Sequence, residues 1–269
     1  MMAFSSNKVL FFIALLVYAL LFACGGTQKV RTMPARDRLE HAMKLLEKKK
    51  NLRASTEFKI LVLNNPGSSF VDTAQFYLAE SFFNMKEYIT AAAEYEKLLR
   101  VYPRSNFTDN AQYKMGFAYY KLSPRASLDQ EYTTKAIDAF EQFLDEYPES
   151  ELVDDATQKL LDANTKLAKK EFDTGEHYRR AGYWRAAINS YDDVVKYFKF
   201  TRFAEDAYYW RAYCLLKLEE YDEARGTIRY FLAQFPETSY LGRAKSLANQ
   251  IENAAKKAQL ETTANGIKN

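Results

Sequence analysis

The chain has 269 residues, of which 48% are hydrophobic and 27% are charged, so it has enough apolar side chains for a packed core and is not disordered throughout. Its 38 basic and 35 acidic residues leave a formal net charge of +3, which is too balanced for a protein whose partner is nucleic acid. Nine glycines and six prolines supply little turn chemistry for a many-stranded sandwich or barrel, so the composition favours long helices.

Residues 1–23 have the pattern of a signal peptide. Lys8 is the only charged residue among them, and the apolar run over residues 9–23 is shorter than the roughly 20 residues of a membrane-spanning helix. The run ends on Leu21-Phe22-Ala23-Cys24, which resembles a bacterial lipobox, whose cysteine is diacylated and becomes the mature N-terminus. We therefore predict a lipid anchor on Cys24 and a linker over residues 24–36. The alternative is a signal anchor with an incidental cysteine.

Cys214 is the only other cysteine, so no internal disulfide is expected if Cys24 is acylated. It lies in YYWRAYCLLKL, an apolar helical segment, which predicts a buried and inert thiol. The stability of the fold must then come from side-chain packing.

Five copies of one pattern follow along the chain. They align on four prolines and one lysine, Pro66, Pro103, Pro148, Lys199 and Pro236. Twelve residues before these positions stand Ala54, Ala91, Ala136, Ala187 and Ala224, and eight residues after them stand Ala74, Ala111, Ala156, Ala207 and Ala244. Eight residues before them stand the large side chains Phe58, Tyr95, Phe140, Tyr191 and Ile228. Two residues after them stand the hydroxyl side chains Ser68, Ser105, Ser150, Thr201 and Thr238.

Each column has a physical role in a pair of helices. An alanine four residues from a large side chain shares a helix face with it, so a neighbouring helix can approach closely at the alanine. The proline ends the second helix, and the hydroxyl is predicted to cap the next helix, near an acid placed favourably at the helix start. The aligned positions are 37 residues apart in two of the four intervals. A third interval has 45 residues, and Ser123-Pro124-Arg125 within it predicts a loop. The fourth has 51 residues, and we expect one extended helix there from Ala156 through Lys170.

Alanine, aromatic and proline at these offsets are similar to the tetratricopeptide repeat, which stacks helix pairs into a superhelix with a peptide-binding concave face. We therefore predict an all-α fold, a tetratricopeptide-like superhelix of five helix-pair repeats over residues 37–258. The last helix, from Tyr240 to about Ala258, is expected to cap the array. Residues 259–269 have low hydrophobicity and no period, and we expect them to be disordered.

Two segments carry a closer resemblance. The first is LDQEYTTKAI, residues 128–137, with Phe140 and Tyr147-Pro148-Glu149-Ser150 after it, and the second is LAKKEFDTGEHYRRAGYWRAAINSYDDVV, residues 167–195. Together with the lipobox and the repeats, they resemble the BamD family of outer-membrane protein assembly lipoproteins. The resemblance implies a non-catalytic, lipid-anchored scaffold at the periplasmic face of the outer membrane. It implies binding to the barrel-shaped insertase BamA through the C-terminal repeats, alongside other assembly lipoproteins, with unfolded barrel clients received by the N-terminal repeats.

Two aromatic sets are candidate binding sites. Residues 76–83 contain more aromatic side chains than one amphipathic helix normally buries, and by the resemblance an extended client segment would dock there: Phe76, Tyr77, Phe82 and Phe83. The fourth repeat has tyrosine, tryptophan and arginine, which are favoured at interface hot spots, outside the repeat columns: Tyr178, Arg179, Arg180, Tyr183, Trp184 and Arg185. For Trp184, which is equivalent to Tyr88 and Tyr221 of other repeats, a packing role is the alternative.

Two segments are strongly charged. Residues 29–53 contain nine basic and three acidic side chains, a net charge of +6, which would suit anionic headgroups or acidic partners. Residues 129–155 contain ten acids against Lys135, a net charge of −9, which would orient docking to a basic surface. Solvated helix faces are the alternative explanation for both.

Signs of catalysis are weak. His41 and His177 are the only histidines and neither has neighbours with metal-ligand spacing, so we expect no metal and no cofactor. Glu80-Ser81 resembles the catalytic dipeptide of lytic transglycosylases, but the glycine-rich segments of those enzymes are missing. We predict that the chain is not an enzyme. The alternatives are a lipidated repeat protein that assists secretin or pilus assembly or envelope division and, further off, a peptidoglycan hydrolase.

Overall fold

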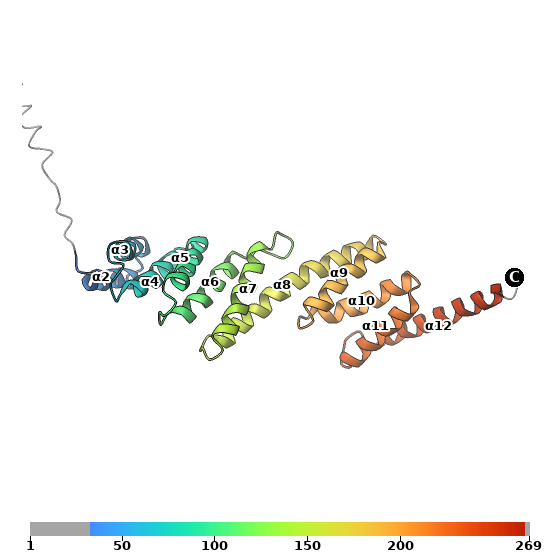
Figure 1. The fold of residues 1–269 in the computed structure, drawn as a ribbon. Coiled ribbons are helices and arrows are strands. Elements are labelled where there is room, and N and C mark those ends of the chain that lie inside the picture. The colour runs from blue at the N-terminus through green and yellow to red at the C-terminus, as the bar shows by residue number, and fades with distance from the viewer. Residues whose placement is uncertain (1–32, 267–269) are drawn as a thin grey trace, which may run out of the picture.

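The structure, a computed structural model, describes residues 33–266, and within this range it contains helices and no strands (Figure 1). The signal peptide predicted for residues 1–23, Cys24 and most of the predicted linker lie outside the described residues. The helices are α2 (Ala35–Glu47), α3 (Asn51–Asn64), α4 (Val71–Asn84), α5 (Tyr88–Val101), α6 (Thr108–Leu122), α7 (Glu131–Glu146), α8 (Val153–Arg180), α9 (Trp184–Tyr197), α10 (Phe203–Lys217), α11 (Tyr221–Gln234) and α12 (Leu241–Gly266).

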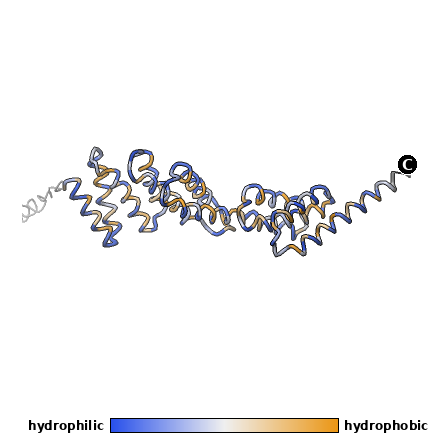
Figure 2. The backbone as a smooth tube through the Cα atoms, turned by 90° about the horizontal axis from the view of Figure 1, so that it is seen from below, coloured by the Kyte–Doolittle hydropathy of each residue, from blue (hydrophilic) through white to orange (hydrophobic). Residues whose placement is uncertain are grey.

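The helices form an elongated array in which each helix packs against the next one along the chain (Figure 1). Helices α2 to α11 make five successive pairs, and α12 packs on α11 at the end of the array. Hydrophobic and hydrophilic residues alternate along the helices, because packing against neighbouring helices buries part of the circumference of each helix and leaves the rest exposed (Figure 2). The predicted all-α, tetratricopeptide-like array of helix pairs is confirmed.

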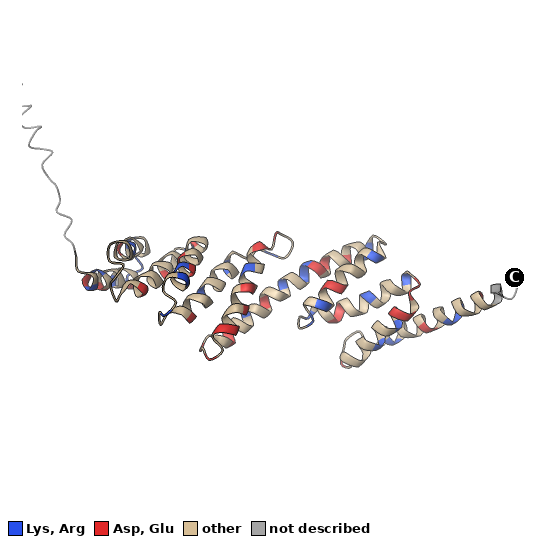
Figure 3. Ribbon diagram, in the orientation of Figure 1, with Lys and Arg blue, Asp and Glu red and all other residues tan. Residues whose placement is uncertain are grey.

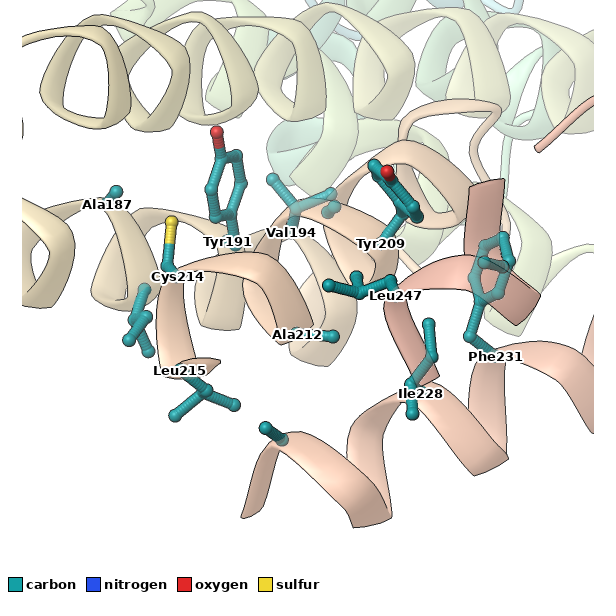
Figure 4. Close-up of a cluster of buried hydrophobic side chains, with 14 of the residues drawn as sticks. Ala187, Tyr191, Val194, Tyr209, Ala212, Cys214, Leu215, Ile228, Phe231 and Leu247 are labelled. Atoms are coloured by element: carbon teal, nitrogen blue, oxygen red, sulfur yellow. The ribbon is translucent and has the colours of Figure 1, made fainter. Parts of the chain in front are cut away.

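The repeat columns form the core. All ten alanines of the two alanine columns are fully buried, and so are the large side chains Phe58, Tyr95, Phe140 and Tyr191. The C-terminal repeats share one continuous cluster of buried side chains, drawn in part in Figure 4, which runs from Ala168 to Ile251. The repeats before it are filled by three smaller clusters.

The short turns inside the helix pairs use left-handed residues. Lys49, Lys86, Gly182 and Glu219 have φ angles of 54°, 64°, 80° and 62°. In each turn the backbone N–H of the following residue donates to the carbonyl five residues earlier, as in the bond from Glu87 to Phe82 at 3.0 Å. This is the 6→1 bond of a Schellman motif, which satisfies a carbonyl at the helix end. Only one of the four turns uses glycine, the residue that accepts this conformation without steric cost.

The hydroxyl column does not cap the helices as predicted. The N-cap residues of α4 and α6 are Phe70 and Phe107, with no side-chain cap bond, because one extra turn separates the hydroxyl from the helix. The hydroxyl of Ser105 instead accepts the backbone N–H of Phe107 at 3.2 Å and donates to Asp72 at 2.7 Å.

The same hydrogen bond recurs between repeats. Ser150 donates to Asp109 at 3.0 Å, and Thr238 donates to Glu205. These inter-repeat hydrogen bonds join the starts of α4 and α6, of α6 and α8, and of α10 and α12. Asp72, Asp109 and Glu205, the acids near the helix starts, therefore also tie neighbouring repeats together.

The bond is missing between α8 and α10. The hydroxyl of Thr201 donates to the carbonyl of Phe198 at 2.8 Å, and within residues 33–266 the structure gives Asp154 no side-chain hydrogen bond. Helix α8 has 28 residues where α4 has 14, and at 1.5 Å per residue the difference moves the fourth repeat by about 20 Å along α8. The predicted extended helix is confirmed and is longer than expected.

The C-terminal end differs from the prediction. Helix α12 continues to Gly266, through residues 259–266 that were expected to be disordered. Its buried side chains end at Ala255, and Leu260 is exposed. The six residues that follow Ala255, KKAQLE, are strong helix formers, so they continue the helix beyond its last buried contact.

Candidate functional site

The four aromatics predicted to receive client chains do not form one exposed surface. Phe76 is buried and stacks on Phe107, with ring centroids 4.7 Å apart. Tyr77 and Phe82 are half-buried and pack against the clusters on both sides of α4. Helix α4 lies between α3 and α5, so it buries two faces where an amphipathic surface helix would bury one. Phe76 is therefore a core residue, and of the four we assign only Phe83 to the surface described next.

Phe83 begins a continuous surface on the first helices of successive pairs, α4, α6 and α8. Its ring lies 5.5 Å from that of Phe117 on α6, which lies 6.2 Å from that of Tyr120. Four lysines stand over these rings: Lys114 over Phe83 at 5.1 Å, Lys121 and Lys159 over Phe117 at 4.8 Å, and Lys166 over Tyr120 at 5.7 Å. We call these seven residues the aromatic–lysine face.

The charges on this face are mixed. Lys114 pairs with Glu80 at 3.1 Å, and Lys159 pairs with Asp155 at 2.8 Å. Within residues 33–266 the structure gives no ion pair for Lys121 or Lys166. Burial lowers the pKa of Lys166, whose ammonium donates to the hydroxyl of Ser123 at 2.5 Å while Asp162 acts in the opposite direction. Ring faces, ammonium groups and carboxylates in one surface suit a polypeptide with apolar and polar side chains better than a polyanion.

Sequence reasoning missed most of this face. The available signal was Lys114, Phe117 and Lys121 at spacings of three and four, which share one side of a helix. Phe83 and Lys159 join them only because α4 and α8 flank α6 in space.

The predicted partner-binding residues gather at the turn between α8 and α9. Tyr183 is 67% exposed, and Tyr178, Arg180 and Arg185 are also exposed. These four form the outward part of the set, which we call the α8–α9 turn surface. Arg185 pairs with Glu220 of the next repeat.

The other two residues of the set have packing roles. Arg179 makes two bonds to Glu176, at 2.7 and 2.8 Å, and its guanidinium stacks on Trp210 at 3.8 Å. Trp184 is half-buried against Tyr213, as the packing alternative predicted. Both side chains hold α8 and α9 against α10, which positions the exposed tyrosines above them.

A close contact fixes the angle between α8 and α9. Tyr191 is fully buried, and its hydroxyl donates to Glu176 at 2.8 Å. The ring lies against Gly175, where a Cβ atom would come within 2.6 Å of the Tyr191 Cε1 atom. Only glycine allows this approach, so the sequence at position 175 sets the geometry of the turn surface.

No catalytic arrangement accompanies these surfaces. Glu80 accepts the Tyr95 hydroxyl and pairs with Lys114, while Ser81 is buried and bonds to the carbonyl of Tyr77 at 2.7 Å. Burial raises the pKa of the Cys214 thiol to about 12, as expected for an inert cysteine. Among the described residues no cluster of histidine, cysteine and acidic side chains could hold a metal ion. None of the helices in residues 33–266 combines the length and hydropathy that a membrane span requires.

The sequence also matches known proteins. The family model described as YfiO, outer membrane lipoprotein, matches residues 31–210. The chain belongs to the YfiO outer membrane lipoprotein family. A tetratricopeptide repeat model matches residues 206–238, within the fifth helix pair of this YfiO-family chain.

A curated relative points the same way. The outer membrane protein assembly factor BamD of Rickettsia prowazekii (strain Madrid E) is 25% identical to this YfiO-family chain over 209 residues, 78% of this chain and 83% of that protein. The resemblance to the BamD family drawn from the sequence is thereby confirmed.

Solved helical-repeat structures are more distant. The match to the TPR2AB domain of yeast Sti1 in complex with pHSP90 spans 87% of this chain and 95% of that chain, with 17% sequence identity and a TM-score of 0.40. The match to a tetratricopeptide repeat protein of Parabacteroides merdae spans 86% of this chain and 79% of that chain, with 15% sequence identity and a TM-score of 0.36. Neither similarity is close enough to bear on what the chain binds.

Proposed function

We propose that the chain is a lipid-anchored, non-catalytic scaffold of the machinery that assembles β-barrel proteins in the outer membrane. The family match and the relative named BamD support the pathway. Two separate surfaces, the aromatic–lysine face and the α8–α9 turn surface, support a role in holding more than one protein. The anchor would be Cys24, exposed after removal of residues 1–23 and joined to the helical array by residues 24–36.

The α8–α9 turn surface is our candidate for binding a BamA-type insertase. Tyr178 and Tyr183 offer apolar rings with polar tips, and Arg180 and Arg185 offer planar charged groups. These side chains are enriched at interface hot spots because they bury much area per rotatable bond. Gly175 and Trp184 beneath them hold the backbone in place, so the surface is ordered before it binds.

The aromatic–lysine face is our candidate for client chains. The observation that carries this part is the continuity of rings and ammonium groups across three successive first helices. An unfolded barrel segment alternates apolar and polar side chains, so rings and lysines side by side would accept both kinds at once.

One experiment tests the pathway and the insertase assignment. Tagged protein is purified from detergent-solubilised outer membrane, and its partners are identified by mass spectrometry. We expect a β-barrel protein with periplasmic domains, and we expect Tyr183→Ser combined with Arg180→Glu to reduce its recovery about tenfold. Recovery of a secretin or of division proteins would move the scaffold to another pathway.

The client assignment needs a second measurement. A photo-crosslinking amino acid at position 121 should capture barrel clients during their assembly, and the same probe at Lys256 on α12 serves as the control. Equal capture at both positions would contradict a client site on the aromatic–lysine face, while leaving the insertase assignment in place.

A further inference from the structure

An apolar groove lies on α8, on the side away from the aromatic–lysine face. It has a volume of about 360 Å³ and is bordered by α7, α8 and the end of α9. On α8 the groove is lined by Thr157, Leu160, Leu161 and Asn164. The aromatic–lysine face takes Lys159 and Lys166 from the same helix, and the acids beside that face are Asp155 and Asp162. At 100° per residue these two sets project on opposite sides of the helix.

The groove exists because α8 is long. Helix α7 packs on the N-terminal part of α8 and α9 packs on its C-terminal part, so α7 and the end of α9 flank the middle of α8 without closing over it. The inter-repeat hydrogen bond that joins the other repeats is missing at this junction.

The groove exposes apolar side chains. Phe200 is 82% exposed, Tyr197 is 59% exposed and Leu161 is 40% exposed. A cluster of exposed apolar side chains on a folded protein marks an interaction site.

The repeat pattern does not require Phe200. One residue after the aligned position, the other four repeats have Gly67, Arg104, Glu149 and Glu237. An aromatic at this position is therefore a property of the fourth repeat alone, and burial within the chain does not account for it.

The charges around the groove are arranged in two walls. Glu141 of α7 lines one side, with Asp145 one turn further, and the structure gives neither an ion pair within the described residues. Figure 3 shows acidic residues gathered on α7 and at the start of α8. On the other side Lys196, Lys199 and Arg202 stand over the rings of Tyr197, Phe200 and Phe203.

We propose that this groove binds a polypeptide segment of a partner protein, with an apolar side chain in the groove and a basic residue against α7. Walls of opposite charge suit a polypeptide segment with both basic and acidic side chains better than a uniformly anionic membrane surface. The basic rim places acidic or polar groups of the segment beside Lys199 and Arg202. Asn164 uses only part of its hydrogen-bonding capacity on the carbonyl of Leu160, so its amide can also bond to the backbone of the segment. The site is separate from both surfaces assigned above and does not depend on the proposed pathway.

The test is photo-crosslinking in cells with the full chain. A p-benzoylphenylalanine replaces Leu161, and in a matched control it replaces Leu63, which is 64% exposed on α3. We expect position 161 to form a protein adduct whose crosslinked segment has an apolar residue with a lysine or arginine nearby. Phe200→Ser and Glu141→Lys should each lower the adduct yield about tenfold. Glu146→Lys, an exposed acid on α7 outside the groove, should leave the yield unchanged.

The opposite results are equally clear. Adducts to lipid, adducts to a second copy of this chain, or a yield at position 161 no higher than at position 63 would each overturn the proposal. So would an equal loss of adduct from Glu141→Lys and Glu146→Lys, because it would reflect net charge and not the groove. The substituted side chains are all exposed, so the variants should keep the wild-type circular dichroism spectrum.

Discussion

The first three repeats and the last two differ in how their cores are built, although both contain the inter-repeat hydrogen bond, which Thr238 and Glu205 make between α10 and α12. Hydrogen bonds from Ser105 to Asp72 and from Ser150 to Asp109 tie the starts of α4, α6 and α8, and three separate clusters fill the space between these helices. The last two repeats share one cluster, and α8, which packs on both α7 and α9, joins them to the first three. The junction without the hydrogen bond has the groove lined by Tyr197, Phe198 and Phe200, whereas the hollows at the α4–α6 and α6–α8 junctions are lined by the loops that carry Ser105 and Ser150. The difference teaches that lengthening one helix opens an exposed apolar groove while the stacking on either side is kept.

The test with the largest expected effect removes a fully buried aromatic ring from each of the two regions. Phe58→Ala in the first cluster and Phe231→Ala in the C-terminal cluster should each cost about 3 to 5 kcal/mol of unfolding free energy, through lost burial and a cavity. Hydrogen exchange should rise only in α2 to α4 for the first variant, and across the end of α8 to α12 for the second. A uniform rise along the chain in both variants would mean that the two regions unfold as one unit.

A second test uses glycines at close contacts. A Cβ atom at Gly175 would lie 2.6 Å from Tyr191, and one at Gly116 would lie 3.0 Å from Phe140. Gly175→Ala should therefore destabilise the chain by about 1 to 3 kcal/mol, and Gly116→Ala by less, in chemical denaturation. Gly226→Ala is the control, since no atom lies within 4 Å and alanine favours the helix, so it should stabilise slightly. Equal effects at positions 175 and 226 would remove the packing argument for the α8–α9 turn surface.

A third test removes an inter-repeat hydrogen bond. Ser150→Ala should lower the unfolding free energy by about 1 kcal/mol, because Asp109 loses its partner. Asp154→Ala, at the junction where the bond is missing, should lose only the favourable charge at the start of α8, about 0.3 kcal/mol, and urea midpoints would distinguish the two. If both variants lost the same stability, the hydrogen bond would not be what separates the two kinds of junction.

The smallest effects should come from the left-handed turns. Lys86→Gly and Glu219→Gly relieve a non-glycine residue at positive φ and should each stabilise by about 0.5 to 1 kcal/mol. Gly182→Ala should destabilise by a similar amount, at the turn beneath Tyr183. Thermal melts of the three variants provide the measurement, and a lower melting temperature for Lys86→Gly would show that the flexibility of glycine in the unfolded chain outweighs the relief.

The sequence determined the fold of this protein because its repeat is a regular spacing of small and large side chains. Small residues at fixed offsets from large ones allow only close helix pairs, and every alanine that the pattern singled out is fully buried. The 51-residue interval also predicted the long helix α8, because extra residues without turn signals lengthen the helix in which they lie. The helical course of residues 259–266 was not foreseen, because low hydrophobicity argues against burial and not against a helix.

Tertiary structure alone decided where the surfaces lie. The aromatics of residues 76–83 looked like one exposed set, and the packing of α4 on both sides buried Phe76 and left Phe83 to the aromatic–lysine face. The hydroxyl column suggested helix caps, while its partners proved to be acids 33 or 41 residues away. The groove beside Phe200 depends on side chains from three helices. Periodicity along one helix indicates which side of it is buried. Which side chains from other helices lie next to its exposed side depends on how the helices are arranged in space, and the sequence pattern does not give that arrangement.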